Sequence, residues 1–145
     1  MPVVTRGRDI AAPVADVWRV VSDPHALPRW WPRVERVEEV TGERWTTVLL
    51  SDRGKPIRAD YTLTAAQAME TIEWEQELAE TPFERMLSRA HTRIALTDVD
   101  GTATGVTLRS IERLRGLARL GAPMVRRATR KRLDEALDRL AEAVG

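Results

Sequence analysis

Four polar side chains occupy alternating positions within otherwise apolar faces of predicted strands. They are Tyr61, Gln76, Thr92 and Ser110. Because successive side chains of a strand point to opposite faces, they share faces with Ile57, Trp74, Ile94 and Leu108. Buried polar groups need partners, and a pocket uses a few such groups to orient an apolar ligand. We predict that these faces line a ligand pocket, with Ile94 and Leu108 in its wall. The alternative is a filled core in which the polar groups bond to one another or to the backbone.

The same residues supply the two candidates for catalysis. Tyr61 is a candidate proton donor if Gln76 holds a carbonyl group of the substrate. His91 is a general base only if a bulge turns it inward, because strand alternation points it outward with Arg89 and Arg93. General acid–base catalysis needs a group with a tuned pKa close to the substrate, and sequence supplies the groups without the geometry.

The chain has five tryptophans against one tyrosine and one phenylalanine. A tryptophan offers a flat apolar body with one N–H donor, which suits polycyclic or acyl ligands. The candidates for the pocket wall are Trp30, Trp31, Trp45 and Trp74. Met86 and Met124 add an adaptable wall in the same hypothesis. Plain core packing is the alternative for all six residues, and it is the interpretation we adopt for Trp18.

Several kinds of chemistry are excluded or unsupported by the sequence. There is no cysteine, which excludes disulfides, thiolate nucleophiles and zinc–cysteine sites. His25 and His91 are the only histidines, and no carboxylate stands at a metal-ligand spacing from either. Asp98-Val99-Asp100-Gly101 lacks the later ligands of a calcium loop, so we interpret it as a turn. No nucleophile elbow, phosphate loop or dinucleotide motif is present. We expect neither a metal nor a cofactor.

The stretch from Arg109 to Arg132 holds nine basic residues and one acid, Glu112. Positive charge near the start of a helix opposes its dipole, so an anion should offset it. The candidates are an outer strand face with Glu70, Glu73, Glu75 and Glu77, an anionic head group, a lipid surface or a partner. The alternative is a solvated arginine face. A nucleic-acid partner is not expected, because net charge is only +1 and no aromatics interleave the basic run.

The order of predicted elements defines an α+β domain. Residues Val3–Ile10 form a strand, and Pro13 opens an amphipathic helix that Asp23-Pro24 ends. A proline-punctuated arm runs from Pro24 to Pro32, followed by about six strands with one apolar and one polar face between 34 and 114. A helix opened by Pro123 carries the stripe Ala122, Val125, Thr129, Leu133, Ala136, Leu140 and Val144. This helix must cover the apolar face of the sheet, and unfilled space beneath it would be the pocket.

Bulk properties fit one domain over residues 1–145. The N-terminus lacks the apolar stretch of a signal peptide, and no run reaches the roughly 18 apolar residues of a membrane span. We expect a cytoplasmic protein without stable membrane insertion. A homodimer is compatible with the sequence but not required by it.

The N-terminal motifs are A-A-P-V-A-D-V-W ending at Trp18, the Asp23-Pro24 break, and L-P-R-W-W-P over residues 27–32. With the arginine-rich lead into the terminal helix over residues 116–144, they resemble the START-like (SRPBCC) superfamily. Within it they resemble the polyketide cyclase/dehydrase and lipid transport family. The resemblance implies a helix-grip fold, a curved antiparallel sheet of about seven strands around a long C-terminal helix, with two short helices after the first strand.

The superfamily binds hydrophobic small molecules such as lipids, sterols, polyketides and quinones, and some members are cyclases or aromatases. The resemblance therefore implies binding of a hydrophobic or amphipathic small molecule between the sheet and the terminal helix. One alternative is a polyketide cyclase or aromatase that uses the same cavity. Another is a partner-binding module that uses the basic C-terminal helix. Fold alone does not decide between these functions.

Overall fold

The strands form a single antiparallel sheet in the computed structural model, which describes residues 2–51 and 53–144. The seven strands run in the order β1-β7-β6-β5-β4-β3-β2, so β1 and β2 are its edges. They are β1 (Val3–Ile10), β2 (Val34–Thr41), β3 (Arg44–Leu50), β4 (Pro56–Gln67), β5 (Thr71–Glu77), β6 (Leu87–Val99) and β7 (Ala103–Leu114). The expected helix-grip architecture is confirmed.

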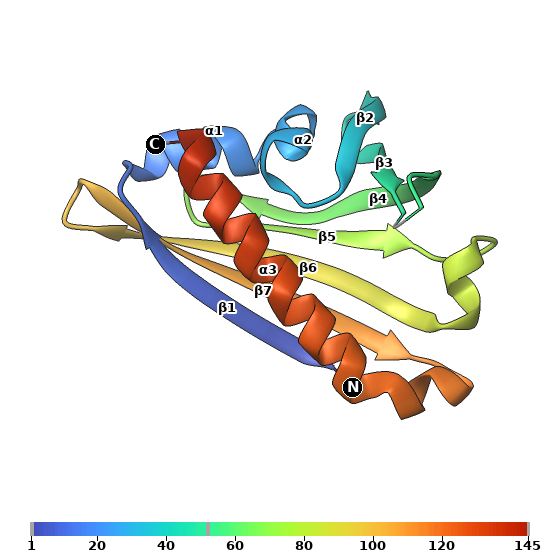
Figure 1. Ribbon diagram of the computed structural model, residues 1–145. Helices are drawn as coiled ribbons and strands as arrows, with labels where there is room; N and C mark the ends of the chain where they lie inside the picture. The colour runs from blue at the N-terminus through green and yellow to red at the C-terminus, as the bar shows by residue number, and fades with distance from the viewer. Residues whose placement is uncertain (1, 52, 145) are drawn as a thin grey trace.

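The long helix α3 (Ala122–Val144) crosses one face of the sheet diagonally (Figure 1). Its buried side chains are Thr129, Leu133, Ala136, Leu137 and Leu140. They recur at helical spacing and belong to the same core as the inward-facing side chains of the central strands. Arg6 and Arg8 of β1 form ion pairs with Asp134 and Asp138, so the edge strand is also joined to the helix at the surface.

Two short helices and a 3-10 turn follow β1, as the sequence predicts. They are α1 (Val14–Val21), η1 (Pro24–Ala26) and α2 (Leu27–Trp30). The Asp23 carboxylate accepts a hydrogen bond from the His25 N–H at 3.0 Å and so caps η1. Arg139 of α3 donates hydrogen bonds to the carbonyls of Pro28 (3.0 Å) and Trp31 (3.1 Å). These bonds hold the arm against α3, where it closes one side of the space under the helix.

The β6–β7 hairpin turns at Asp100-Gly101, as predicted. Both residues have positive φ, 51° and 79°, which a type I′ turn requires at its two central positions. The Asp98 carboxylate accepts a hydrogen bond from the Gly101 N–H at 3.1 Å. The aspartates therefore act within the turn. At the opposite end of the sheet, β5 and β6 are joined through the 3-10 turn η2 (Pro82–Arg85).

The start of α3 is less buried than the sequence pattern predicts. The predicted stripe begins at Ala122 and Val125, but these are only half-buried, and the first buried residue is Thr129. The preceding 3-10 helix η3 (Gly116–Gly121) has no buried residue. The chain from η3 to the first turns of α3 lies at the end of the sheet beside the β7 terminus, beyond the main core (Figure 1).

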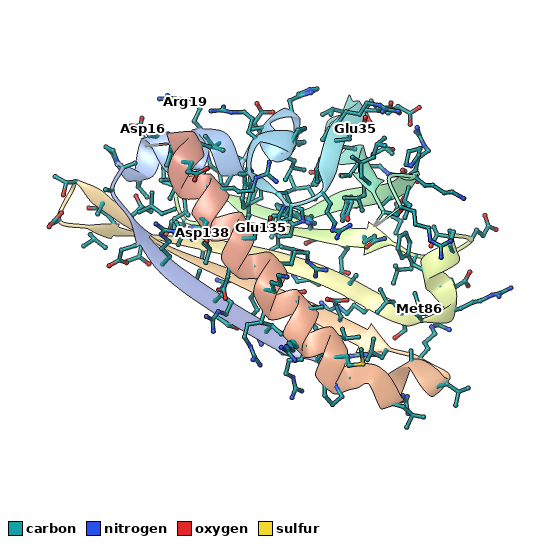
Figure 2. All side chains as sticks on the ribbon, viewed as in Figure 1. Asp16, Arg19, Glu35, Met86, Glu135 and Asp138 are labelled. Carbon is teal, nitrogen blue, oxygen red and sulfur yellow. The ribbon has the colours of Figure 1, made fainter. Side chains whose placement is uncertain are left out.

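Leu133 is the most direct test of the grip between helix and sheet, because its side chain is fully buried under α3. We expect Leu133→Ala to lower the free energy of unfolding by about 2–5 kcal/mol through lost burial and the cavity left behind. The exposed Glu135 on the same helix, labelled in Figure 2, provides a control. Glu135→Ala should change stability by less than about 0.5 kcal/mol in the same denaturant titration. Equal effects of the two substitutions would contradict this account of the core.

Candidate functional site

A cavity of about 580 Å³ lies between the sheet, the α2 arm and α3. This volume is within the range of small-molecule sites. Its apolar lining includes Leu27, Trp31, Val34, Trp45, Leu49, Ile57, Trp74, Phe83 and Leu87. Its polar lining includes Thr47, Tyr61, Gln76, Thr92, Ser110, Glu112 and Arg132. The cavity therefore combines an apolar wall with a small set of polar groups.

Strand register brings the predicted polar residues together in two rows across the sheet. In the first row, Tyr61 on β4 lies between Trp45 on β3 and Gln76 on β5. In the second row, Thr92 on β6 lies between Trp74 on β5 and Ser110 on β7. Directly opposed residues on one face have neighbouring side chains, so each row places a tryptophan next to hydrogen-bonding groups.

The tryptophan side chains form one continuous aromatic wall. Trp45 stacks on Tyr61, with ring centroids 5.8 Å apart and an angle of 13° between planes. Trp74 meets Trp45 edge to face at 5.7 Å, and Trp31 meets Trp74 in the same way at 5.9 Å. Offset and edge-to-face contacts are the preferred arrangements of aromatic pairs, so these rings hold one another in place. The wall is therefore pre-organised by its own contacts.

Several polar atoms at the cavity have no hydrogen-bond partner among the described residues. The Trp45 Nε1 and Thr47 Oγ1 atoms are buried and unpartnered. The side chains of Tyr61, Gln76 and Thr92 likewise form no hydrogen bond within the described part of the chain. Leaving a buried polar group unpaired costs about 1–3 kcal/mol, so such groups are uncommon in a filled core. Trp30 Nε1 is also buried without a partner, away from the cavity, so unpaired atoms alone do not mark a site. Beside an open volume, however, Trp45 Nε1, Thr47 Oγ1 and the half-buried groups favour a site that a ligand would occupy.

One end of the cavity carries an ion pair. The Glu112 carboxylate accepts a hydrogen bond from Arg132 Nη2 at 3.1 Å and one from the Thr129 hydroxyl at 2.8 Å. Ser110 Oγ lies 3.5 Å from the same oxygen. Only 14% of the Glu112 side chain is exposed, against 40% for Arg132. The acceptor capacity of Glu112 is therefore largely used, while the other guanidinium N–H groups of Arg132, which lines the cavity, have no hydrogen-bond partner among the described residues.

Burial raises the pKa of the Tyr61 hydroxyl to about 12, and the nearby Arg132 charge offsets part of this effect. The Tyr61 side chain is half-buried and lines the cavity. The phenol is thus neutral at physiological pH and available as a hydrogen-bond donor.

Eight of the predicted site residues border the cavity: Trp31, Trp45, Tyr61, Trp74, Gln76, His91, Thr92 and Ser110. Their part in ligand binding stays a prediction. Trp30, Ile94 and Leu108 are fully buried and do not border it. Ile94 and Leu108 lie opposite one another in the sheet, in the core beneath α3. Trp30 supports the wall from behind, with its ring 5.2 Å from that of Trp31.

The two methionines are not part of the cavity. Met86 is 52% exposed and Met124 is 78% exposed. Met86 ends the η2 turn and Met124 lies in the first turn of α3, and both segments lie outside the main core. The sequence pattern places Met86 near a strand and Met124 in the terminal helix. It does not reveal that the end of η2 and the start of α3 lie beyond the core.

His91 lies on the outer face of the sheet, as strand alternation predicts. Its Nδ1 and Nε2 atoms are each 2.8 Å from a carboxylate, Glu75 and Glu73 respectively. Arg89 also pairs with Glu75, at 3.0 Å. The irregularity of β6 lies earlier, between Leu87 and Arg89, although His91 is among the residues that line the cavity. Because both ring nitrogens bond to outer-face glutamates, this geometry does not favour a general base, and that role stays a prediction.

Sequence reasoning missed five polar residues that border the cavity: Arg33, Thr47, Ser51, Glu112 and Arg132. Two of them could have been found from strand alternation, because Thr47 follows Trp45 by two positions and Glu112 follows Ser110 by two. Arg132 stands three positions after the buried Thr129, on the side of the helix that faces the sheet.

The described residues contain no group of three or more His, Asp or Glu side chains that could hold a metal ion. No helix within the described ranges is long and apolar enough to cross a membrane.

Tyr61 is the only tyrosine, so tyrosinate absorbance reports on it alone. We expect the folded protein to titrate with a pKa near 12, and the urea-unfolded chain near the ordinary value of about 10. Because the folded-state pKa is the higher one, the associated stability is fully present below pH 10. It is lost as the pH rises towards 12. An ordinary midpoint in the folded protein would show that the phenol is not buried at the cavity.

Solved structures share this fold at low sequence identity. A START superfamily protein from Mycobacterium smegmatis aligns with a TM-score of 0.81 and 14% identity over 98% of this chain and 96% of that chain. A protein from Thermus thermophilus aligns with a TM-score of 0.78 and 22% identity over 99% and 97% of the two chains.

The di-domain ARO/CYC protein BexL from the BE-7585A biosynthetic pathway aligns with a TM-score of 0.81 and 22% identity. That alignment covers 98% of this chain but only 46% of BexL, so this chain spans less than half of that protein's length. These likenesses show the shared fold.

No curated protein sequence matches the chain. The sequence model for polyketide cyclase / dehydrase and lipid transport proteins matches residues 1–145. The chain therefore belongs to the polyketide cyclase/dehydrase and lipid transport family.

Proposed function

We propose that the protein binds an uncharged amphipathic small molecule in the cavity between the sheet and α3, as a carrier or a ligand-dependent modulator. The observation that carries this proposal is the 580 Å³ cavity, in which unpartnered polar atoms stand beside an aromatic wall. A filled core would pair these atoms or replace them by apolar groups.

The aromatic wall supports a ligand with a flat or extended apolar body. Trp31, Trp45 and Trp74 present ring faces and edges that already contact one another. Such surfaces bind ring systems and acyl chains by burying apolar area without first having to become ordered. Polyketides, quinones and lipids all meet this description, and the wall does not discriminate among them.

The polar groups support a ligand that accepts hydrogen bonds. Trp45 N–H can only donate, and the neutral Tyr61 hydroxyl is available to donate. Glu112 is the one carboxylate in the lining, and Arg132, Thr129 and Ser110 already surround it. Carbonyl and hydroxyl oxygens of a ligand fit this pattern. Glu112 balances the charge of Arg132, and the other arginine of the lining, Arg33, donates a hydrogen bond to the Leu50 carbonyl. The groups beside the aromatic wall therefore favour an uncharged ligand over a carboxylate.

A polyketide cyclase or aromatase is the second candidate. The observation in its favour is that Tyr61 and Gln76 are cross-strand neighbours at the cavity, as a donor and a carbonyl-holding group would need to be. Against it, a pKa of about 12 makes Tyr61 a poor proton donor at neutral pH. We therefore place ligand binding first.

The binding proposal is tested by native mass spectrometry of freshly purified protein, followed by denaturing extraction and by titration with the uncharged apolar dye Nile red. Thr92 borders the cavity, so Thr92→Phe should fill part of it. We expect this variant to lose any co-purified ligand and to bind Nile red at least about tenfold more weakly, a change of about 1.4 kcal/mol.

The matched control is Thr107→Phe, because Thr107 is exposed on the opposite face of the neighbouring strand β7. It adds the same apolar side chain away from the cavity and should bind like the wild type. A wild-type protein with neither co-purified ligand nor saturable dye binding would contradict the proposal. Equal losses in both variants would contradict the assignment of the cavity.

Tyr61→Phe separates the two candidate functions. If the protein is a cyclase with Tyr61 as proton donor, the variant should lose about 10²- to 10⁴-fold in turnover of a polyketide-like substrate. Its affinity should fall by no more than about tenfold, which is the effect of one neutral hydrogen bond. If the protein is a carrier, only the small change in affinity occurs. Wild-type turnover by the variant would rule out the proposed catalytic role of Tyr61.

A further inference from the structure

The segment from Arg113 to Arg132 is strongly basic in a chain with almost no net charge. It holds eight of the 23 basic residues and none of the 22 acidic ones, so the rest of the chain is net negative. Seven of these cations are exposed: Arg113, Arg115, Arg119, Arg126, Arg127, Arg130 and Lys131. None of the seven forms an ion pair with a described residue, whereas Arg132 pairs with Glu112.

Three of the four glutamates that could have offset this charge have other partners. Glu73 and Glu75 bind the two ring nitrogens of His91 on the outer face of the sheet. Glu77 forms an ion pair with Arg44 on β3. The first turn of α3 contains no acidic residue that would complement the helix dipole. The positive charge at this end of the molecule is therefore uncompensated within the described part of the chain.

The most exposed large apolar side chains of the described residues lie in the same segment. Leu117 is 85% exposed, Leu120 is 82% exposed and Met124 is 78% exposed. Residues three apart eclipse one another in a 3-10 helix, so Leu117 and Leu120 project from the same side of η3. Met86, 52% exposed, belongs to this cluster because its carbonyl accepts a hydrogen bond from the Arg115 N–H at 2.8 Å. Figure 2 shows Met86 at the same end of the molecule.

We propose that this basic-apolar surface, formed by the seven cations together with Met86, Leu117, Leu120 and Met124, adsorbs reversibly to an anionic phospholipid bilayer. The apolar side chains enter the boundary between head groups and acyl chains, and the arginines bind the surrounding phosphates. The charge asymmetry of the chain orients this end towards the membrane. No segment inserts through the bilayer.

A bilayer fits this surface better than an acidic protein does. Protruding leucines need apolar pockets on a protein partner, whereas a bilayer accepts them at any position. Arginines interleaved with long apolar side chains are typical of segments that lie in the membrane interface. An acidic protein would account for the charges but not for three apolar side chains that are each about four-fifths exposed.

The surface also adjoins one end of the cavity. Met86 immediately precedes Leu87, which lines the cavity together with Phe83 of η2. At the other boundary, Arg132 lines the cavity and follows the cationic turns of α3. Adsorption through this surface would therefore bring that end of the cavity close to the bilayer.

The test is flotation of the full chain with vesicles of two compositions, pure phosphatidylcholine and equal parts of phosphatidylcholine and phosphatidylglycerol. We expect binding to the anionic vesicles only, weakening as salt is raised. Arg126→Gln/Arg127→Gln/Arg130→Gln should weaken binding by about 100-fold, at roughly 1 kcal/mol for each arginine. Leu117→Ser/Leu120→Ser should weaken it by at least about tenfold.

Matched variants separate a defined surface from diffuse attraction. Arg19→Gln/Arg53→Gln/Arg58→Gln makes the same change in net charge elsewhere, and Met69→Ser removes an exposed apolar side chain elsewhere. Both should bind anionic vesicles like the wild type. Equal losses in the control and test variants would overturn the proposal. Failure of the wild type to float with anionic vesicles at low salt would also overturn it, whether or not an acidic polypeptide binds the surface.

Insertion is measured directly because the chain has no cysteine. Leu117→Cys and Met69→Cys can each carry a single environment-sensitive fluorophore. We expect a blue shift on addition of anionic vesicles at position 117 and none at position 69. A shift at neither position, despite flotation, would show charge-only adsorption and contradict the apolar part of the proposal.

Discussion

The architecture depends on the burial of one helix stripe against one face of the sheet. Helix α3 presents Leu133, Ala136 and Leu140 to the centre of the sheet, and all three are fully buried. A single helix cannot cover a seven-stranded sheet, so α1 and the α2 arm must cover another part. Arg139 joins the arm to α3 by two hydrogen bonds to its backbone. The cavity is the space that these covering elements leave above β3 to β7.

The cavity is maintained against collapse by rigid groups at an energetic cost. The rings of Trp31, Trp45 and Trp74 brace one another, so none can rotate freely to fill the space. Meanwhile Trp45 Nε1 and Thr47 Oγ1 remain buried without partners, each at a cost of about 1–3 kcal/mol relative to a bonded state. In the proposed function, a ligand that supplies acceptors to these groups would bind more tightly for that reason.

Strand alternation predicted much of the site because it is a local geometric rule. It placed Tyr61, Gln76, Thr92 and Ser110 on the inner face, and it placed His91 on the outer face. Sequence could not separate Trp30 from its neighbour Trp31, because only the path of the arm decides which ring faces the cavity. The prediction that Met86 and Met124 line the cavity was wrong for a related reason. A helical or turn pattern does not reveal where an element extends beyond the core, and that depends on the length of the sheet.

In the proposed adsorption, these projecting segments would bring the cavity close to the bilayer. The exposed leucines of η3 and the exposed arginines of the first turns of α3 lie outside the core, at the end of the molecule where η2 lines the cavity. An apolar ligand that moves through water exposes its whole apolar surface, at roughly 25 cal/mol for each Å². Transfer of the ligand at a bilayer surface would shorten the time for which its apolar surface is exposed to water. Adsorption through a few side chains is weak enough to reverse, and a carrier needs this property if it is to leave with its ligand.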